Sequence, residues 1–506
     1  MDAIEQLKED LRAGRIDPQR LVELMVALQH KLQAAQQRIA ELEKQIAGST
    51  TKIDEPFSTR AEEKRQEARG KTKRKKQRQG RRGRFTTADK VAQAERAVDV
   101  LPDGLDKSQC QWSHVRPVWR LENGRAVLIA YHIFRGPKDH YGKIPGVLGR
   151  SEFGMEIVVT IAYLVYVVGL SFDKVCLILN FFQNLKLKKT QADALLYQLS
   201  RHWQNEFEIL CTLLANSLVV YADETSWSLN SVWAFLSEKA RLLFFGVHKD
   251  AETLQAILDP ATFAGLVFSD DAAVYANFSA AQKCWAHLLR KAIKLTLQEP
   301  NNLDYRNFTD RLLEIYRAAC RLQRDGRFSA AGRAQKIPEL DEQIFELCAP
   351  LWAAELPPLE GPDDDYRLLV NELMRLMLQK QLFTFVTAKA ATQPNGVTPP
   401  LGATNNEAER TLRNPALARK TGRTNKTMNG ARRQTILTSV LESLRLYLPT
   451  FTLSSVLAEM DRWLEQGRSC FAALLKKLKL HTPQEAVLDQ VLPLPVPEQV
   501  LPQPSG

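Results

Sequence analysis

Cysteine is scarce in this 506-residue chain, and none of its seven cysteines forms a Cys-x-x-Cys pair. A scattered, odd set of cysteines argues against a disulfide framework and for a reducing compartment. Long apolar runs are also absent, since residues 157–170 fall short of the roughly 20 residues that a membrane helix needs. The charged, amphipathic N-terminus does not resemble a signal peptide. These absences exclude a secreted disulfide-rich protein and an integral membrane protein, and we expect a cytoplasmic one.

Acidic residues are missing from residues 71–84, which carry nine lysines and arginines. The surrounding residues 48–90 are polar and nearly free of large apolar side chains, which predicts a disordered basic linker. Much of the net charge of +11 lies in this tract, as expected for contact with a polyanion. A solubilising tail is the alternative. The tract would bind DNA phosphates without reading sequence, and the candidate contacts are Lys73, Arg74, Lys75, Lys76, Arg81 and Arg82.

The N-terminal residues 1–47 have a helical pattern. Between residues 21 and 46, apolar side chains recur at alternating four- and three-residue steps, which is the a/d seam of a heptad repeat. The seam predicts a coiled coil that makes the protein a homodimer or higher oligomer. An amphipathic helix packed on the main body is the alternative.

Residues 216–289 have the pattern of a mixed sheet, in which three strands joined by hairpins precede a helix and two more strands. The expected strands are residues 218–222, 232–236, 242–247, 265–268 and 284–286, and the expected helix is residues 251–258. In this order of elements the ends of the first and fourth strands are neighbours. Asp223 and Asp270 follow those two strands, so they would meet at one edge and could share a magnesium ion.

Four sequence blocks carry a resemblance to a known family. The blocks ADETSW, SDDAAVY, QKCWAHLLRK and TNNEAERTLRNPALARK occur in this order between residues 150 and 475. They resemble the signature blocks of the insertion-sequence-66 type of bacterial transposase. The resemblance implies an α/β ribonuclease H-like catalytic core with an Asp-Asp-Glu triad that binds Mg²⁺ or Mn²⁺.

The third carboxylate is expected on a helix beside the sheet edge, where Glu407 and Glu409 are the candidates. Thr404 and Glu407 have the spacing of a capping box, which would give Glu407 a structural role. Glu409 matches the acidic position of the resembled block, so we predict Asp223, Asp270 and Glu409 as the catalytic metal ligands. Asp271 is the alternative to Asp270. Glu224 would point to the opposite face of the strand from Asp223.

The remaining chain predicts helical regions around this core. Residues 91–150 are interpreted as a degenerate zinc-finger-like module. Related transposases often carry two Cys-x-x-Cys pairs there, whereas this chain has Cys110, His114, His132 and His140, so zinc is not expected. The other expected regions are a helix-turn-helix-like DNA-binding domain or plain helical support (151–215), an all-helical insertion (290–400), the last part of the core with C-terminal helices (401–480) and a disordered tail (481–506).

Basic side chains surround the expected catalytic residues. His287 could contact a phosphate or water, or be a packed histidine, and Trp285 is expected in the core. Leu289 stands where the resembled family has an arginine. The expected contacts to the DNA backbone outside the linker are Lys188, Lys189, Arg290, Lys291, Arg410, Arg413, Arg419 and Lys420, with Arg423 and Lys426 beside them.

These features predict a nucleoid-associated transposase that cleaves the ends of its element and joins the 3′-OH groups to target DNA. Its expected partners are double-stranded DNA and possible accessory proteins of the element. A DNA-binding regulator without catalysis is one alternative. A ribonuclease H-like nuclease without strand transfer is another.

Overall fold

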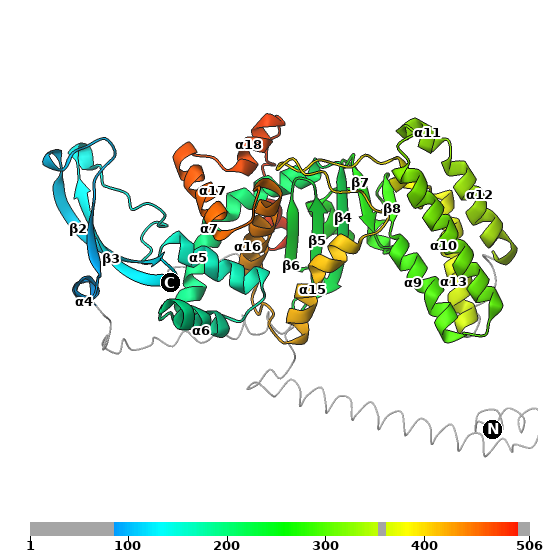
Figure 1. Ribbon diagram of the computed structural model, residues 1–506, viewed down its shortest axis with the longest axis horizontal. Helices are drawn as coiled ribbons and strands as arrows, with labels where there is room; N and C mark the ends of the chain where they lie inside the picture. The colour runs from blue at the N-terminus through cyan, green and yellow to red at the C-terminus, as the bar shows by residue number, and fades with distance from the viewer. Residues whose placement is uncertain (1–85, 353–360, 494–506) are drawn as a thin grey trace, which may run out of the picture. The chain divides into compact units, whose positions relative to one another are not determined.

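The computed structural model describes residues 86–352 and 361–493, which form a three-stranded and a five-stranded sheet among many helices (Figure 1). The predicted coiled coil at residues 1–47 and the basic tract at residues 71–84 lie outside the described residues, so both stay predictions. Within the described ranges, no helix is long and apolar enough to cross a membrane.

The first sheet occupies the region that was interpreted as a degenerate zinc-finger-like module. Its strands are β1 (Arg96–Val100), β2 (Gln111–Glu122) and β3 (Arg125–Arg135), in the order β1-β3-β2. Asn123 and Gly124 both have positive φ, as the two-residue turn between β2 and β3 requires. Helix α4 (Thr87–Ala92) precedes the sheet and begins inside the segment that was predicted as linker. Short 3₁₀ turns, η1 (Lys107–Gln109) and η2 (Pro137–Asp139), complete the region.

Four helical segments follow. Gly169, with φ of 80°, lies between the second and the third. The last segment is long, and Phe207, Leu210 and Leu214 continue its buried face beyond Trp203. These segments are α5 (Met155–Ala162), the π-helical η3 (Tyr163–Val167), α6 (Phe172–Gln183) and α7 (Lys189–Ala215). Whether they act as a helix-turn-helix stays a prediction.

The five-stranded sheet has the order β6-β5-β4-β7-β8. Antiparallel hairpins join the first three strands, and β4 pairs in parallel with β7, so the predicted neighbours are confirmed. The strands are β4 (Val219–Ser226), β5 (Ser231–Ser237), β6 (Arg241–Val247), β7 (Leu266–Ser269) and β8 (Ala281–Lys283), with α8 (Ala251–Ile257) before β7 and the 3₁₀ turn η4 (Ala273–Tyr275) after it.

The predicted fifth strand, residues 284–286, is wrong. The strand is β8, and helix α9 (Trp285–Gln298) already begins at Trp285 with Cys284 as its N-cap. The strand was hidden because Gln282 and Lys283 are polar although they are buried. Their polar atoms find partners inside: the Gln282 side chain donates to the Leu382 carbonyl (2.9 Å). Trp285 is buried, as expected.

A helix covers the edge strand β6. This helix, α16 (Met428–Tyr447), lies along β6 (Figure 1) and places buried hydroxyl groups against the backbone N–H groups that β5 leaves unpaired. Edge strands otherwise present free N–H and C=O groups to other chains. The amide–hydroxyl pairs are Arg241–Ser443 at 2.9 Å, Leu243–Ser439 at 3.0 Å and Phe245–Thr435 at 3.0 Å.

We expect Ser439→Ala to lower the free energy of unfolding by about 1–3 kcal/mol, because it leaves the buried Leu243 N–H without its acceptor. Chemical denaturation of the purified protein measures this change. The exposed Ser279→Ala is the control and should stay within about 0.5 kcal/mol of the original protein. Equal effects of the two substitutions would contradict the proposal that the α16 hydroxyl groups stabilise the edge of β6.

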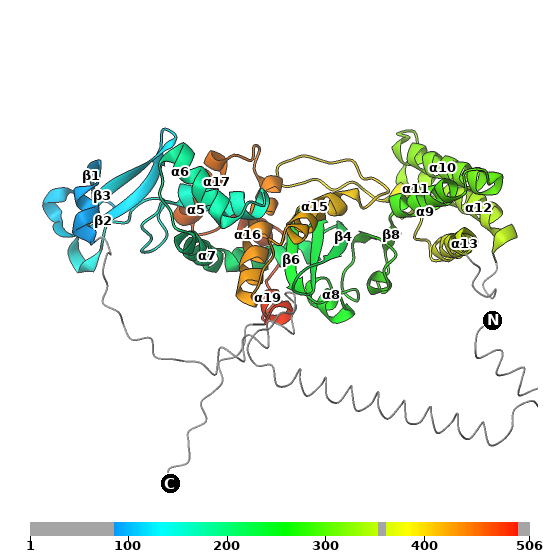
Figure 2. The same cartoon turned by 90° about the horizontal axis from the view of Figure 1, so that it is seen from below.

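The opposite edge, β8, is covered by the helical insertion, which lies between the second and third predicted carboxylates. Thr384 donates to the Ala281 carbonyl (2.9 Å), and the Lys283 N–H donates to the Gln381 carbonyl (2.9 Å). Insertion helices share one apolar core with Phe268 and Trp285. Figure 2 shows α10 (Leu303–Arg324), α11 (Ala330–Ala334), α12 (Ile337–Cys348) and α13 (Pro362–Leu378) grouped beside α9. The insertion also contains α14 (Thr384–Thr387) and the 3₁₀ turn η5 (Ala349–Leu351).

The C-terminal region contains α15 (Asn406–Lys420), α17 (Leu453–Gln466) and α18 (Cys470–Lys477) besides α16. The expectation of a disordered tail from residue 481 is wrong for its first part, because α19 (Val487–Val491) packs into the main core. Leu488 and Leu492 are fully buried there. Arg432 of α16 donates to the Leu488 carbonyl (3.2 Å) and forms an ion pair with Asp489 (2.6 Å). The proline-rich composition of residues 481–506 indicated disorder, although Leu488 and Leu492 are buried in the core.

Candidate active site

The first two predicted carboxylates belong to neighbouring parallel strands, one within its strand and one directly after it. Asp223 lies within β4, which continues to Ser226, and Asp270 directly follows β7. Alternate residues of β4 belong to different cores: Val219 and Tyr221 pack on the insertion side, and Val220 and Ala222 on the opposite side. Asp223 therefore shares the face of Tyr221, whereas Glu224 points to the other face, as predicted.

Glu224 is held in a buried network of its own. Its side chain is only 2% exposed, accepts a hydrogen bond from the Tyr275 hydroxyl (2.5 Å) and forms an ion pair with Lys249 (2.6 Å). No sequence pattern indicated this network, because Lys249 and Tyr275 belong to different segments. It places a second negative charge directly behind Asp223.

Asp223 lies in an electrostatically unfavourable place for a carboxylate. Burial raises its pKa to about 7, and the charges of Glu224, Asp270 and Glu409 add to the rise. The backbone N–H of Glu224 donates to the Asp223 carboxylate (2.9 Å) and opposes the shift. Among the described residues, no ion pair involves Asp223 or Asp270. The site therefore gathers negative charge that a cation would neutralise.

The predicted capping box of Thr404 and Glu407 at the start of α15 is wrong. The helix begins at Asn406 with Asn405 as N-cap, and no side chain caps it. Asn405 instead donates its side-chain amide to the Ala222 carbonyl (2.7 Å), which ties α15 to β4 beside Asp223. Glu407 forms an ion pair with Arg241 of β6, so its structural role is a different one from capping.

Glu409 lies close to three groups from α9. It forms an ion pair with Arg290 (2.7 Å), and its Oε1 lies 3.6 Å from His287 Nδ1. Cys284, His287 and Glu409 offer ligand atoms within 4.8 Å of one another, and they are the group of described residues that could hold a metal. Asp223 and Asp270 are not in that group, although the charge of Glu409 reaches Asp223. The predicted triad is thus brought to one region without forming one tight cluster.

Three further residues of this region, Glu372, Arg375 and Lys283, were missed by the sequence analysis. A cavity of about 500 Å³ lies in front of Asp270 and His287, and α13 of the insertion lines it with Glu372 and Arg375. Arg375 pairs with Asp271, which separates the role of Asp271 from that of Asp270. Lys283 is buried and donates to the Asp270 carbonyl (2.9 Å), and burial lowers its pKa. No sequence signal linked α13, more than 90 positions away, to Asp270.

The cysteine and the histidines of residues 91–150 lie on different elements, and paired strands place His114 and His132 near each other. Cys110 follows η1, His114 lies in β2, and His132 of β3 lies 3.3 Å from Asp99. Among the described residues, the candidate metal group of Cys284, His287 and Glu409 includes none of them, nor His140.

The predicted DNA contacts within the described residues are surface groups, and several have acidic partners. Lys189 pairs with Asp173 (3.1 Å) and Lys291 with Glu372 (2.5 Å). Arg419 is half-buried and donates to the Ser226 carbonyl (2.7 Å). The exposed members are Lys188, Lys189, Arg290, Lys291, Arg410, Arg413 and Lys420.

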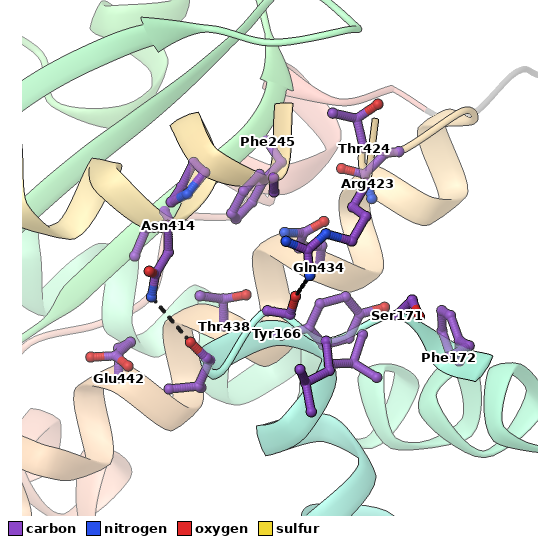
Figure 3. A pocket seen from close by; sticks show the side chains of 18 of the residues that line it. Tyr166, Ser171, Phe172, Phe245, Asn414, Arg423, Thr424, Gln434, Thr438 and Glu442 are labelled. Carbon is purple, nitrogen blue, oxygen red and sulfur yellow. Dashed lines mark hydrogen bonds between the residues drawn. The ribbon is translucent and has the colours of Figure 1, made fainter. Parts of the chain in front are cut away.

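A second cavity, of about 320 Å³, lies beside α15 (Figure 3). Phe245 of β6, Asn414 of α15 and Gln434 of α16 line it, together with η3. Asn414 donates to the Val167 carbonyl (3.2 Å), which joins α15 to the helical region before the sheet. The cavity also borders Arg410, the residue after Glu409. None of Cys284, His287 and Glu409, the candidate metal group among the described residues, lines it.

Comparison with known proteins agrees with the resemblance found in the sequence. No curated protein matches the chain. Residues 150–433, more than half of the chain, match the model of the Transposase IS66 family, and this range contains Asp223, Asp270 and Glu409. The chain therefore belongs to the IS66 family of transposases.

Proposed function

We propose that this chain is a DNA transposase of the Asp-Asp-Glu type, with Asp223, Asp270 and Glu409 as its catalytic residues. The observation that carries the proposal is their placement. The first carboxylate lies on β4, the second directly follows the parallel strand β7, and the third lies on a helix that is tied to β4 by Asn405. The chain belongs to a transposase family, which agrees with a DNA-processing role.

We infer further that the five-stranded sheet is a ribonuclease H-like core. The support is its strand order with three antiparallel strands, followed by two strands parallel to β4. Since such sheets occur in several kinds of nuclease, the fold alone does not define the reaction. The proposal rests on the site.

The proposed cofactor is Mg²⁺ or Mn²⁺, and the residues fit it. Carboxylate oxygens are the ligands that magnesium prefers. Burial and then the neighbouring negative charges raise the pKa of Asp223, and no ion pair among the described residues compensates its charge. Asp223, Asp270 and Glu409 would hold the ions. When bound, the ions would activate the attacking oxygen and stabilise the leaving oxygen in hydrolysis and strand transfer.

The chain's own residues would hold and orient the DNA. The exposed cationic side chains of α9 and α15 would neutralise backbone phosphates near the carboxylates. Arg290 and Lys291 currently pair with Glu409 and Glu372, and they would exchange these partners for phosphate oxygens. Lys283 fixes the Asp270 backbone from behind and stays buried.

The test is an assay of the purified full chain with DNA that carries the ends of its own element. We expect cleavage and a joined product with Mg²⁺ or Mn²⁺, and neither product with a chelator. Cleavage without joining under all conditions would favour a nuclease. Binding without any cleavage would favour the non-catalytic regulator, because that function needs no carboxylate triad.

A further inference from the structure

We propose that Cys284, His287 and Glu409 form a binding site for a thiophilic divalent cation of the zinc class. The site lies at the wall of the cavity in front of Asp270. It is distinct from the proposed Mg²⁺ ligands Asp223 and Asp270. The inference shares Glu409 with the proposed function and therefore rests on it in part.

The first observation is how the three donors are assembled. Cys284 is the N-cap of α9 and His287 lies in its first turn, so a three-residue spacing places both on one side of the helix start. Glu409 approaches from α15. The Trp285 N–H donates to the Ala403 carbonyl (3.1 Å), which joins the two helix starts. As a result, a sulfur, a nitrogen and an oxygen atom lie within 4.8 Å of one another.

The second observation is an unsatisfied nitrogen. His287 Nδ1 is buried and has no hydrogen-bond partner among the described residues, and it lies 3.6 Å from Glu409 Oε1. A buried polar atom without a partner is costly. A cation between these atoms would use the nitrogen and would attract the carboxylate.

The third observation concerns the groups behind the donors. The Asn405 backbone N–H donates to Cys284 Sγ (3.1 Å), and hydrogen bonds of this kind orient metal ligands. Cys284 is buried, whereas the His287 side chain is about one third exposed and lines the cavity. Arg290 holds the place of a cation on Glu409 and is itself exposed, so it can leave.

The donor set decides the kind of ion. Thiolate and imidazole ligands select zinc-like ions, whereas magnesium prefers oxygen ligands alone. Cys284, His287 and Glu409 supply three protein donors. Because zinc-like ions take four ligands, the fourth position would be open to water or to a phosphate oxygen. Since His287 lines the cavity with Asp270, that position would face the DNA-binding side of the site.

The test is a titration of the full chain, without DNA, with Co²⁺ as a spectroscopic substitute for Zn²⁺. We expect a thiolate-to-cobalt charge-transfer absorption that Zn²⁺ removes and excess Mg²⁺ does not. Cys284→Ser should abolish the absorption, and His287→Gln should weaken cobalt binding by about 100-fold or more, since loss of outer partners alone costs 10- to 100-fold. Cys176→Ser, at a half-buried cysteine of α6, is the matched control and should keep the absorption.

His287→Gln is a second test that does not depend on the folding of the Cys284→Ser variant. It retains Cys284, so the same charge-transfer absorption should appear in it at higher Co²⁺ concentrations. No charge-transfer absorption in the original protein, or an absorption that survives Cys284→Ser, would overturn the proposal. Asp223→Asn should bind cobalt normally even if it joins no DNA. Normal cobalt binding by a chain without metal-dependent cleavage would refute the proposed function and leave this site standing.

Discussion

Replacing Glu409 with glutamine is expected to reduce metal-dependent DNA cleavage and joining by about 1,000-fold or more, as for loss of a group that stabilises transition-state charge. Glutamine keeps the size of the side chain but removes the negative charge that reaches Asp223. The ion pair with Arg290 would also be lost. The reaction rate under single-turnover conditions measures the effect, with DNA binding measured separately.

Glu407→Gln is the matched control, two positions earlier on the same helix. It breaks the half-exposed ion pair with Arg241, so we expect a loss of stability within about 1 kcal/mol and nearly unchanged cleavage. The opposite ranking of the two variants would show that Glu407 is the third carboxylate. Equal, small effects would refute a role for α15 in the chemistry.

Replacing Asp223 with asparagine is expected to stabilise the metal-free protein at pH 8 by about 2 kcal/mol, since one unit of pKa corresponds to about 1.4 kcal/mol and solvent screening reduces the full value. The pKa of Asp223 is about 7 in the folded protein against 3.8 ordinarily, so the folded state binds the extra proton between these values. Its contribution to stability is therefore favourable at low pH. It is lost as pH rises from about 4 to about 7.

Thermal unfolding from pH 4 to 8, with chelator and with Mg²⁺ or Mn²⁺, measures this effect. The divalent ion should stabilise the original protein by binding the folded state, and should stabilise Asp223→Asn far less. Asp310→Asn, an exposed position on α10, is the control and should follow the original protein. A lower melting temperature of Asp223→Asn in chelator at pH 8 would contradict the electrostatic description of the site.

The sequence predicted the strands near the carboxylates well, for reasons visible in particular residues. Buried apolar runs such as those of β4 and β7 are interrupted by few polar side chains, so their pattern alone indicates strands. Asp223 and Asp270 then stood out at the ends of these runs. The family match supports the same region.

Other parts could not be predicted because their interactions link distant positions. Gln282 and Lys283 look like loop residues, yet the fold satisfies them with groups of the insertion and of Asp270. Because the fifth strand was predicted at residues 284–286 instead of 281–283, Cys284 was not recognised as the residue at the start of a helix. The cluster of Cys284, His287 and Glu409 was missed for the same reason. Thr404 has the spacing of a cap, but Asn405 takes the N-cap position because its amide binds β4. Local patterns do not contain such long-range partners.

Covering both edges of the central sheet has a consequence for engineering the protein. The insertion supplies the groups that hydrogen-bond to β8, namely the carbonyls of Gln381 and Leu382 and the hydroxyl of Thr384. Its helices also share an apolar core with Phe268 and Trp285. Excising the insertion would therefore expose both the unpaired backbone groups of an edge strand and an apolar surface, so the shortened protein should aggregate. The same shielding prevents two copies from forming a continuous sheet through β6 or β8.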